Sequence, residues 1–172
     1  MSGHGQNIPA PTAPLPTPAT DGPDKKLVIV GIVGSVLAVL GSFLGWVTVE
    51  DADESLAGTD GDGVFTLITA AITAVLLIVG MVTRKGMVAA SAAVPALITF
   101  AIGLLNFLDP ARLAKASAEG DEAFEGASSE EIDAMIEGIE WTTAAGLWIV
   151  LLGALAGVIA GVMAGLKARS SN

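Results

Sequence analysis

The sequence has no cysteine, no tyrosine and a single histidine, His4. Without cysteine, no disulfide holds the loops, and thiol catalysis and cysteine-ligated metal sites are excluded. Charged residues are also scarce, at 15 % of the 172 residues, whereas a soluble domain usually carries about a quarter. The hydrophobic fraction is 52 %. Little charge combined with much apolar bulk is typical of a membrane protein.

Charge is absent from four long apolar runs, at residues 27–49, 64–83, 87–108 and 141–166. A helix needs about 20 apolar residues to cross the roughly 30 Å hydrocarbon core of a bilayer. Each run is long enough, and none shows the polar face expected of a buried helix in a soluble bundle. We therefore predict an all-α fold, a four-helix transmembrane bundle (residues 27–166) that contacts the lipid bilayer of the cell membrane as a multi-pass protein.

The basic residues predict the orientation of these spans. Six of the eight lie on one side, which the positive-inside rule assigns to the cytoplasm. They are Lys25, Lys26, Arg84, Lys85, Lys167 and Arg169. Both terminal segments, residues 1–26 and 167–172, are thus predicted to be cytoplasmic, and residues 1–26 are a disordered Pro-rich tail whose PxxP spacing (Pro11, Pro14) is common by chance. The opposite side carries loops 50–63 and 109–140, with six and ten acidic residues.

Loop 109–140 has the pattern of two short helices, which predicts an acidic, partly helical extracytoplasmic cap. Gly120 separates them, and Ser128 with Glu131 forms a capping-box pattern. An apolar stripe with helical spacing follows, made of Ile132, Met135, Ile136 and Ile139. This stripe packs on the first outer loop, lies on the membrane surface or binds a partner, and packing within the chain is favoured. It is able to continue directly into the last span. Trp46 and Trp141 are expected at the headgroup level, at the outer ends of their helices.

The stretch GTDGDG (58–63) allows two interpretations. Asp60 and Asp62, helped by Asp53, are candidate calcium ligands, but Val64 occupies the fifth position of the twelve-residue calcium loop, where an oxygen ligand is needed. The favoured alternative is that Asp62 caps the helix that follows. No nucleophile or second catalytic group lies nearby, so a paired-carboxylate enzyme is not supported.

None of the four runs contains Asp, Glu, Lys, Arg or His. Ion carriers and proton relays need such residues inside the membrane, so a coupled transporter is not expected. Thr66, Thr69 and Thr73 are predicted to bond to neighbouring backbone, and Pro95 to bend the third helix near its middle. We expect no enzymatic activity, no cofactor and no nucleic-acid partner.

Glycines recur every four residues in the last run, at Gly153, Gly157, Gly161 and Gly165, and Gly41 and Gly45 follow the same spacing in the first. Glycine lets two helix backbones approach closely in lipid. The pattern favours direct packing of the first helix on the fourth. The alternative is self-association of several copies through these glycine faces.

The segments SFLGWVTV, GTDGDGVFTL and AAGLWIVLLGALAG, with the Pro-rich tail, resemble a group of uncharacterised four-span membrane proteins from actinobacteria. Many members carry proline where this chain has Gly45. The resemblance implies the four-span architecture and no catalytic residue, and actinobacterial phages also encode small four-span proteins. The expected function is a non-enzymatic scaffold or modulator of cell-envelope partners. The alternative is a self-oligomerising, membrane-permeabilising (holin-like) or phage-exclusion protein.

Overall fold

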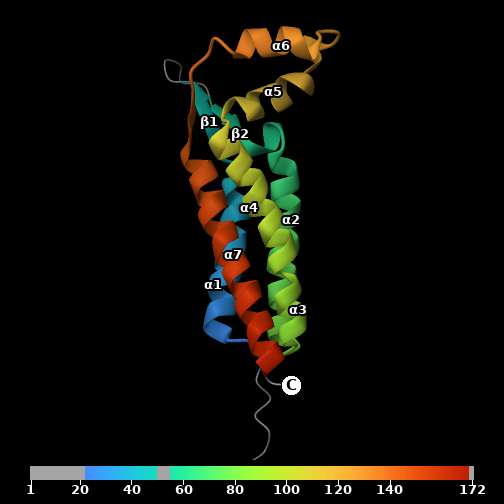
Figure 1. The fold of residues 1–172 in the computed structure, drawn as a ribbon, viewed down its shortest axis with the longest axis vertical. Coiled ribbons are helices and arrows are strands. Elements are labelled where there is room, and N and C mark those ends of the chain that lie inside the picture. The colour runs from blue at the N-terminus through green and yellow to red at the C-terminus, as the bar shows by residue number, and fades with distance from the viewer. Residues whose placement is uncertain (1–21, 50–54, 171–172) are drawn as a thin grey trace, which may run out of the picture.

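The computed structural model describes residues 22–49 and 55–170, which form a long helical bundle with a small cap at one end (Figure 1). The predicted tail therefore lies almost wholly outside the described residues, as does Asp53. The elements in chain order are α1 (Lys25–Gly41), β1 (Gly45–Val49), β2 (Ser55–Ala57), η1 (Gly58–Asp60), α2 (Gly63–Val82), α3 (Gly86–Ser91), α4 (Ala93–Leu108), α5 (Ala111–Glu119), η2 (Glu122–Phe124), α6 (Ser129–Ile136), β3 (Trp141–Thr143) and α7 (Ala145–Ser170).

Three helices of the described chain are long and apolar enough to cross a membrane: Gly63–Val82, Gly86–Leu108 and Ala145–Ser170. The first helix, α1, has 17 residues and is shorter than predicted. It begins where the Asp24 carboxylate accepts from the backbone N–H groups of Lys26 and Leu27, at 2.9 and 3.4 Å. It ends at Gly41, so the prediction of one helix over residues 27–49 is wrong.

The prediction of an all-α fold is confirmed only in part, because the described chain is mostly helical but also forms a three-stranded antiparallel sheet in the order β2-β1-β3. In the central strand, Val47 pairs with Leu56 on one side and Thr143 on the other. Trp46 is an extra residue in the β1–β2 ladder, whose register shifts between Gly45 and Val47. Tryptophan, valine and threonine favour strands, which explains why residues 46–49 leave the helix although they are uncharged.

The third and fourth predicted spans also differ from their predicted form. The third is two helices, α3 and α4, joined at Ala92, so the break lies near its start rather than its middle. Pro95 has no backbone N–H for the carbonyl of Ser91, which accounts for a break at this point. The fourth helix starts at Ala145, and Trp141 belongs to β3. The apolar stripe of α6 therefore does not continue into α7.

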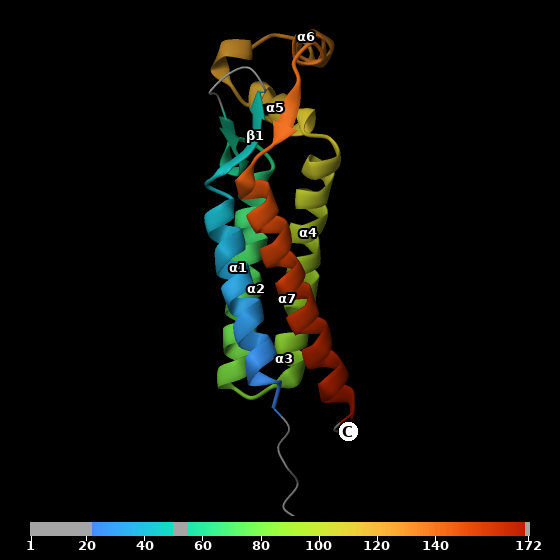
Figure 2. The same ribbon diagram turned by 90° about the vertical axis from the view of Figure 1, so that its left-hand side faces the viewer.

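The first and last helices lie against each other, as Figure 2 shows. A Cβ added to Gly153 would overlap the carbonyl oxygen of Gly34, and one added to Gly41 would lie 3.0 Å from that of Gly146. Three further glycines of α7 lie against α3 and α4: added Cβ atoms on Gly157, Gly161 and Gly165 would meet Ala96, Ala93 and Ala90, respectively, and the one on Gly157 would also meet Thr73 of α2. Gly45 lies in β1 and is therefore not a helix-packing residue.

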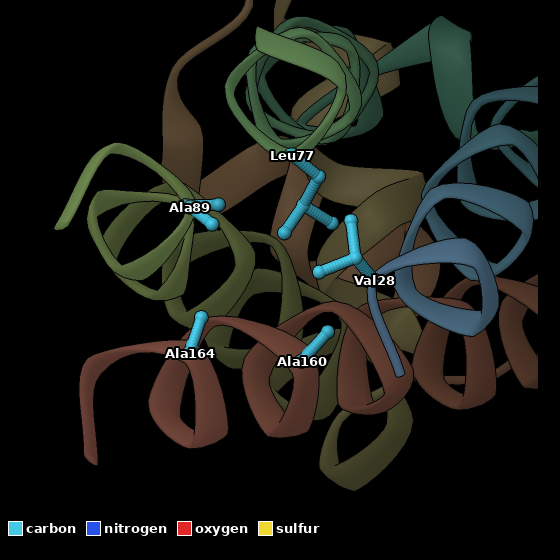
Figure 3. Packing of buried hydrophobic residues seen from close by; sticks show 6 residues of the cluster. Val28, Leu77, Ala89, Ala160 and Ala164 are labelled. Atoms are coloured by element: carbon cyan, nitrogen blue, oxygen red, sulfur yellow. The ribbon is translucent and has the colours of Figure 1, made fainter. Parts of the chain in front are cut away.

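The end of the bundle opposite the cap holds a core of small residues (Figure 3). Val28 from α1 and Leu77 from α2 meet Ala89, Ala160 and Ala164. The six basic residues identified above lie around this end, since they begin α1, join α2 to α3 and end α7. Gly86 lies beside Ala168, with an added Cβ 2.9 Å away, which brings the α2–α3 turn next to the end of α7.

Large apolar side chains point away from the bundle on every long helix. On α1 these include Val30, Val33 and Leu40, each about half exposed. The interior is rich in glycine, alanine, serine and threonine and holds only a few larger apolar side chains, such as Leu77, Leu147 and Val150. A bundle with small residues inside and large apolar residues outside is the reverse of a soluble protein and is typical of helices packed in lipid.

Candidate binding groove in the cap

The cap consists of the three strands, η1, η2, α5 and α6, and it stands on the ends of α1, α2, α4 and α7 (Figure 1). The sheet joins it to the bundle, because β1 follows α1 and β3 precedes α7. Thr48 and Thr142 share a hydroxyl hydrogen bond of 2.9 Å across β1 and β3. In Figure 1, α6 lies beyond α5, at the far tip of the molecule. The two predicted helices of loop 109–140 are thus confirmed.

Trp46 is the fully buried residue at the junction of cap and bundle. Its indole N–H donates to the carbonyl oxygen of Gly41 at 3.0 Å, which satisfies one of the free carbonyls at the end of α1. A Cβ added to Gly58 would overlap the indole ring, and one added to Gly63 would overlap the carbonyl of Gly58. Glycine in GTDGDG therefore provides the space for a tight turn under a tryptophan ring.

The two described aspartates of GTDGDG bond to separate partners. Asp60 accepts from the backbone N–H of Ala57 at 2.8 Å. Asp62 receives the guanidinium Nε of Arg112 at 3.0 Å, and its side chain makes no capping hydrogen bond to α2. The prediction that Asp62 caps this helix is therefore wrong. Among residues 22–49 and 55–170, no three carboxylate or histidine residues come together as metal ligands.

Helices α5 and α6 are held together by charge and by apolar contact. Lys115 on α5 lies 2.9 Å from the Asp133 carboxylate on α6, and this hydrogen bond raises the pKa of Lys115. Ala114 on α5 packs with Ile132 and Ile136, so part of the α6 stripe is buried within the chain. The predicted capping box is confirmed at Ser128 and Glu131.

The remainder of the stripe lines an open groove of about 340 Å³ between α5, α6 and the sheet. Leu56 comes from β2 and Trp141 from β3, while Phe124, Met135 and Ile139 come from the connections and α6. Sequence reasoning identified the stripe but missed the groove, because Leu56 and Trp141 are distant in sequence and meet only through the sheet. The Trp141 indole N–H is buried and has no acceptor among the described residues.

An acidic hollow of about 520 Å³ adjoins this groove. Asp121 and Ser117 line both, and Asp60 and Glu122 complete the acidic lining. Among the residues that the structure describes, no lysine or arginine lines either space. The arrangement places a negative surface beside an apolar one.

The polar residues inside the bundle bond mainly to their own helices, which confirms the prediction for Thr69 and Thr73 but not for Thr66. Thr73 donates to the Thr69 carbonyl at 2.8 Å, and Thr69 and Thr99 share a hydrogen bond of 2.7 Å between α2 and α4. The Thr66 hydroxyl and the Asn106 carbonyl oxygen are buried without a partner among the described residues. The bond between Thr69 and Thr99 thus joins α2 to α4.

The chain matches no protein-family model, no curated protein and no solved structure.

Proposed function

We propose that the chain is a four-span integral membrane protein that acts as a non-enzymatic scaffold or modulator of cell-envelope partners through its acidic cap. Both termini lie in the cytoplasm, and the cap lies on the other side. The resemblance to actinobacterial four-span proteins belongs to the same proposal.

The observation that carries the proposal is the outward belt of large apolar side chains on all the long helices, α1 included. A 17-residue helix is about 26 Å long, which is close to the thickness of the hydrocarbon core. The turn after it adds Phe43 and Leu44, both exposed. Because α1 lies along α7, it occupies the same layer as a helix that is long enough to span. The cap, in contrast, carries most of the acidic residues.

The pore-forming alternative has less support. Self-assembly through glycine needs a glycine face that is open to another copy. Gly41 and the four regularly spaced glycines of α7 all face neighbouring helices of the same chain. A partner-binding cap remains the stronger proposal, because α5 and α6 extend beyond the bundle and leave apolar side chains exposed.

Photo-crosslinking in native membranes tests this function. Benzoylphenylalanine replaces one exposed cap residue at a time, at Glu125, Glu130 or Glu137, and Leu152 on the outward face of α7 serves as the control. We expect discrete protein adducts from cap positions and lipid adducts alone from Leu152. Adducts with lipid or with the same chain at every cap position would contradict the scaffold function.

A further inference from the structure

We propose that the cap groove binds a cationic, amphipathic peptide segment of a partner protein. An apolar side chain of this segment occupies the groove, and a neighbouring lysine or arginine lies in the acidic hollow. The proposal rests on the proposed function, because the cap must stand outside the membrane to meet a partner.

The groove is apolar, accessible and large enough for side chains. Met135 is 52 % exposed and Ile139 is 40 % exposed, although both belong to a stripe whose other members are buried. Exposed apolar surface framed by polar residues marks interaction sites. At about 340 Å³ the groove falls at the small end of ligand pockets, which run from about 300 to 1,000 Å³.

Charge complementarity identifies the occupant as cationic. The acidic hollow shares Asp121 and Ser117 with the groove, so one ligand reaches both spaces. The two basic residues of α5, Arg112 and Lys115, are already engaged by Asp62 and Asp133. A ligand lysine or arginine would therefore meet acidic groups that no described basic residue lining the hollow neutralises.

The same charges exclude other occupants. An anionic lipid headgroup would be repelled by Asp60, Asp121 and Glu122. Residues 50–54, which stand between β1 and β2 in the sequence, read EDADE and are also acidic. The basic residues of α1 and α7 lie at the opposite end of the bundle. A segment of another protein that alternates apolar and basic side chains fits both spaces.

Binding of a defined peptide to the full chain in phosphatidylcholine nanodiscs tests the proposal. The probe is a fluorescein-labelled, twelve-residue synthetic helix with leucine on one face and lysine on the other. Its counterpart carries glutamate in place of each lysine, and empty nanodiscs give the background from lipid. We expect the lysine peptide to bind above background and the glutamate peptide not to bind.

Two matched double variants locate the binding. Asp121→Asn with Glu122→Gln removes two charges from the hollow and keeps an acceptor for the Ala123 N–H, which Asp121 binds at 2.8 Å. Glu125→Gln with Glu130→Gln removes two charges elsewhere on the cap. We expect the first pair to raise the Kd of the lysine peptide about tenfold, which corresponds to about 1.4 kcal/mol, and the second pair to leave it nearly unchanged. Met135→Ser with Ile139→Ser should weaken binding similarly.

Three outcomes would overturn the proposal. The first is that the lysine and glutamate peptides bind equally, or that neither binds above empty nanodiscs. The second is that both double charge variants weaken binding of the lysine peptide to the same extent. The third is association of protein nanodiscs with one another that Met135→Ser with Ile139→Ser abolishes, because the occupant would then be a second copy. Failure of the groove leaves crosslinks from Glu125, Glu130 and Glu137 intact, whereas failure of the proposed function removes them.

Discussion

At the scale of single residues, the junction between bundle and cap depends on the contact between Trp46 and Gly58. The tryptophan ring is fully buried, and its N–H closes the end of α1. The glycine backbone lies against the ring with no room for a side chain. A buried aromatic residue of this size removes a large apolar area from solvent.

Replacing Gly58 by alanine should therefore destabilise the chain. The added methyl overlaps the Trp46 ring, and overpacking of this kind costs about 1–3 kcal/mol. Gly138→Ala is the control, since its added Cβ meets nothing within 4 Å, and we expect a change within about 0.5 kcal/mol. Thermal unfolding in detergent, followed by tryptophan fluorescence, measures both. Equal stability of the two variants would show that the ring yields to the methyl without cost.

Asp62 shows that the interactions of a single residue cannot always be predicted from its neighbours in the sequence. Its position before α2 is that of a capping residue, but its carboxylate pairs with Arg112, fifty positions further along the chain. Local spacing carries no information about such a partner. The capping box of α6 could be predicted because Ser128 and Glu131 need only each other.

At the scale of elements, the stability of the first turn of α6 should depend on pH. Glu131 accepts from the Ser128 backbone N–H at 2.9 Å and from its hydroxyl at 3.0 Å, and these bonds lower the pKa of the carboxyl. The stabilisation is present above the ordinary glutamate pKa and is lost as the pH falls through the lowered value.

We expect the unfolding temperature of the unchanged protein to fall as the pH is lowered. In Glu131→Gln this fall should be smaller, whereas in Glu130→Gln it should be as large as in the unchanged protein. Thermal unfolding at a series of pH values distinguishes them. Identical pH profiles for the two variants would contradict a role of this carboxyl.

The contact between α1 and α7 should be sensitive to one methyl group. Gly153→Ala pushes against the Gly34 carbonyl, which belongs to a helix backbone and yields little. Gly165→Ala meets only the Ala90 side chain, at 3.2 Å. We expect Gly153→Ala to lower the free energy of unfolding by about 1–3 kcal/mol and Gly165→Ala by clearly less. Denaturation in mixed micelles tests this order. A larger loss of unfolding free energy in Gly165→Ala than in Gly153→Ala would show that Gly165, and not Gly153, lies at the tighter helix contact.

The helices could be predicted from their apolar runs, but the sheet could not. The predicted helices wrongly included β1 after α1 and β3 before α7, because these strands are as free of charge as the helices beside them. The pairing of Val49 with Trp141 connects segments that only the folded bundle brings together. The groove was missed for the same reason, since Leu56 and Trp141 line it through that sheet.

At the scale of the whole molecule, charge is sorted to the two ends of an apolar column. Six of the eight lysines and arginines lie around one end, and the acidic cap, which holds the other two, stands at the other. This sorting follows from the sequence alone and supports the proposed orientation.

The absence of cysteine makes that orientation simple to test, since one engineered cysteine is the sole thiol. We expect Glu130→Cys to react with a membrane-impermeant maleimide on intact cells, and Ser170→Cys to react only after permeabilisation. Both positions are exposed in the structure. If Ser170→Cys were labelled on intact cells and Glu130→Cys were not, the orientation would be the reverse of the one proposed.

The central place of β1 in the sheet has a consequence for how the protein is made. Its neighbour β2 follows at once, but β3 emerges only after α2 to α6 have been synthesised. At the usual rate of about 5–20 residues per second, the delay is on the order of ten seconds. During that interval one edge of β1 is open, and it closes only when the ribosome has delivered the start of the last helix. A truncated or stalled product would thus display an unpaired strand, which distinguishes it from the finished protein.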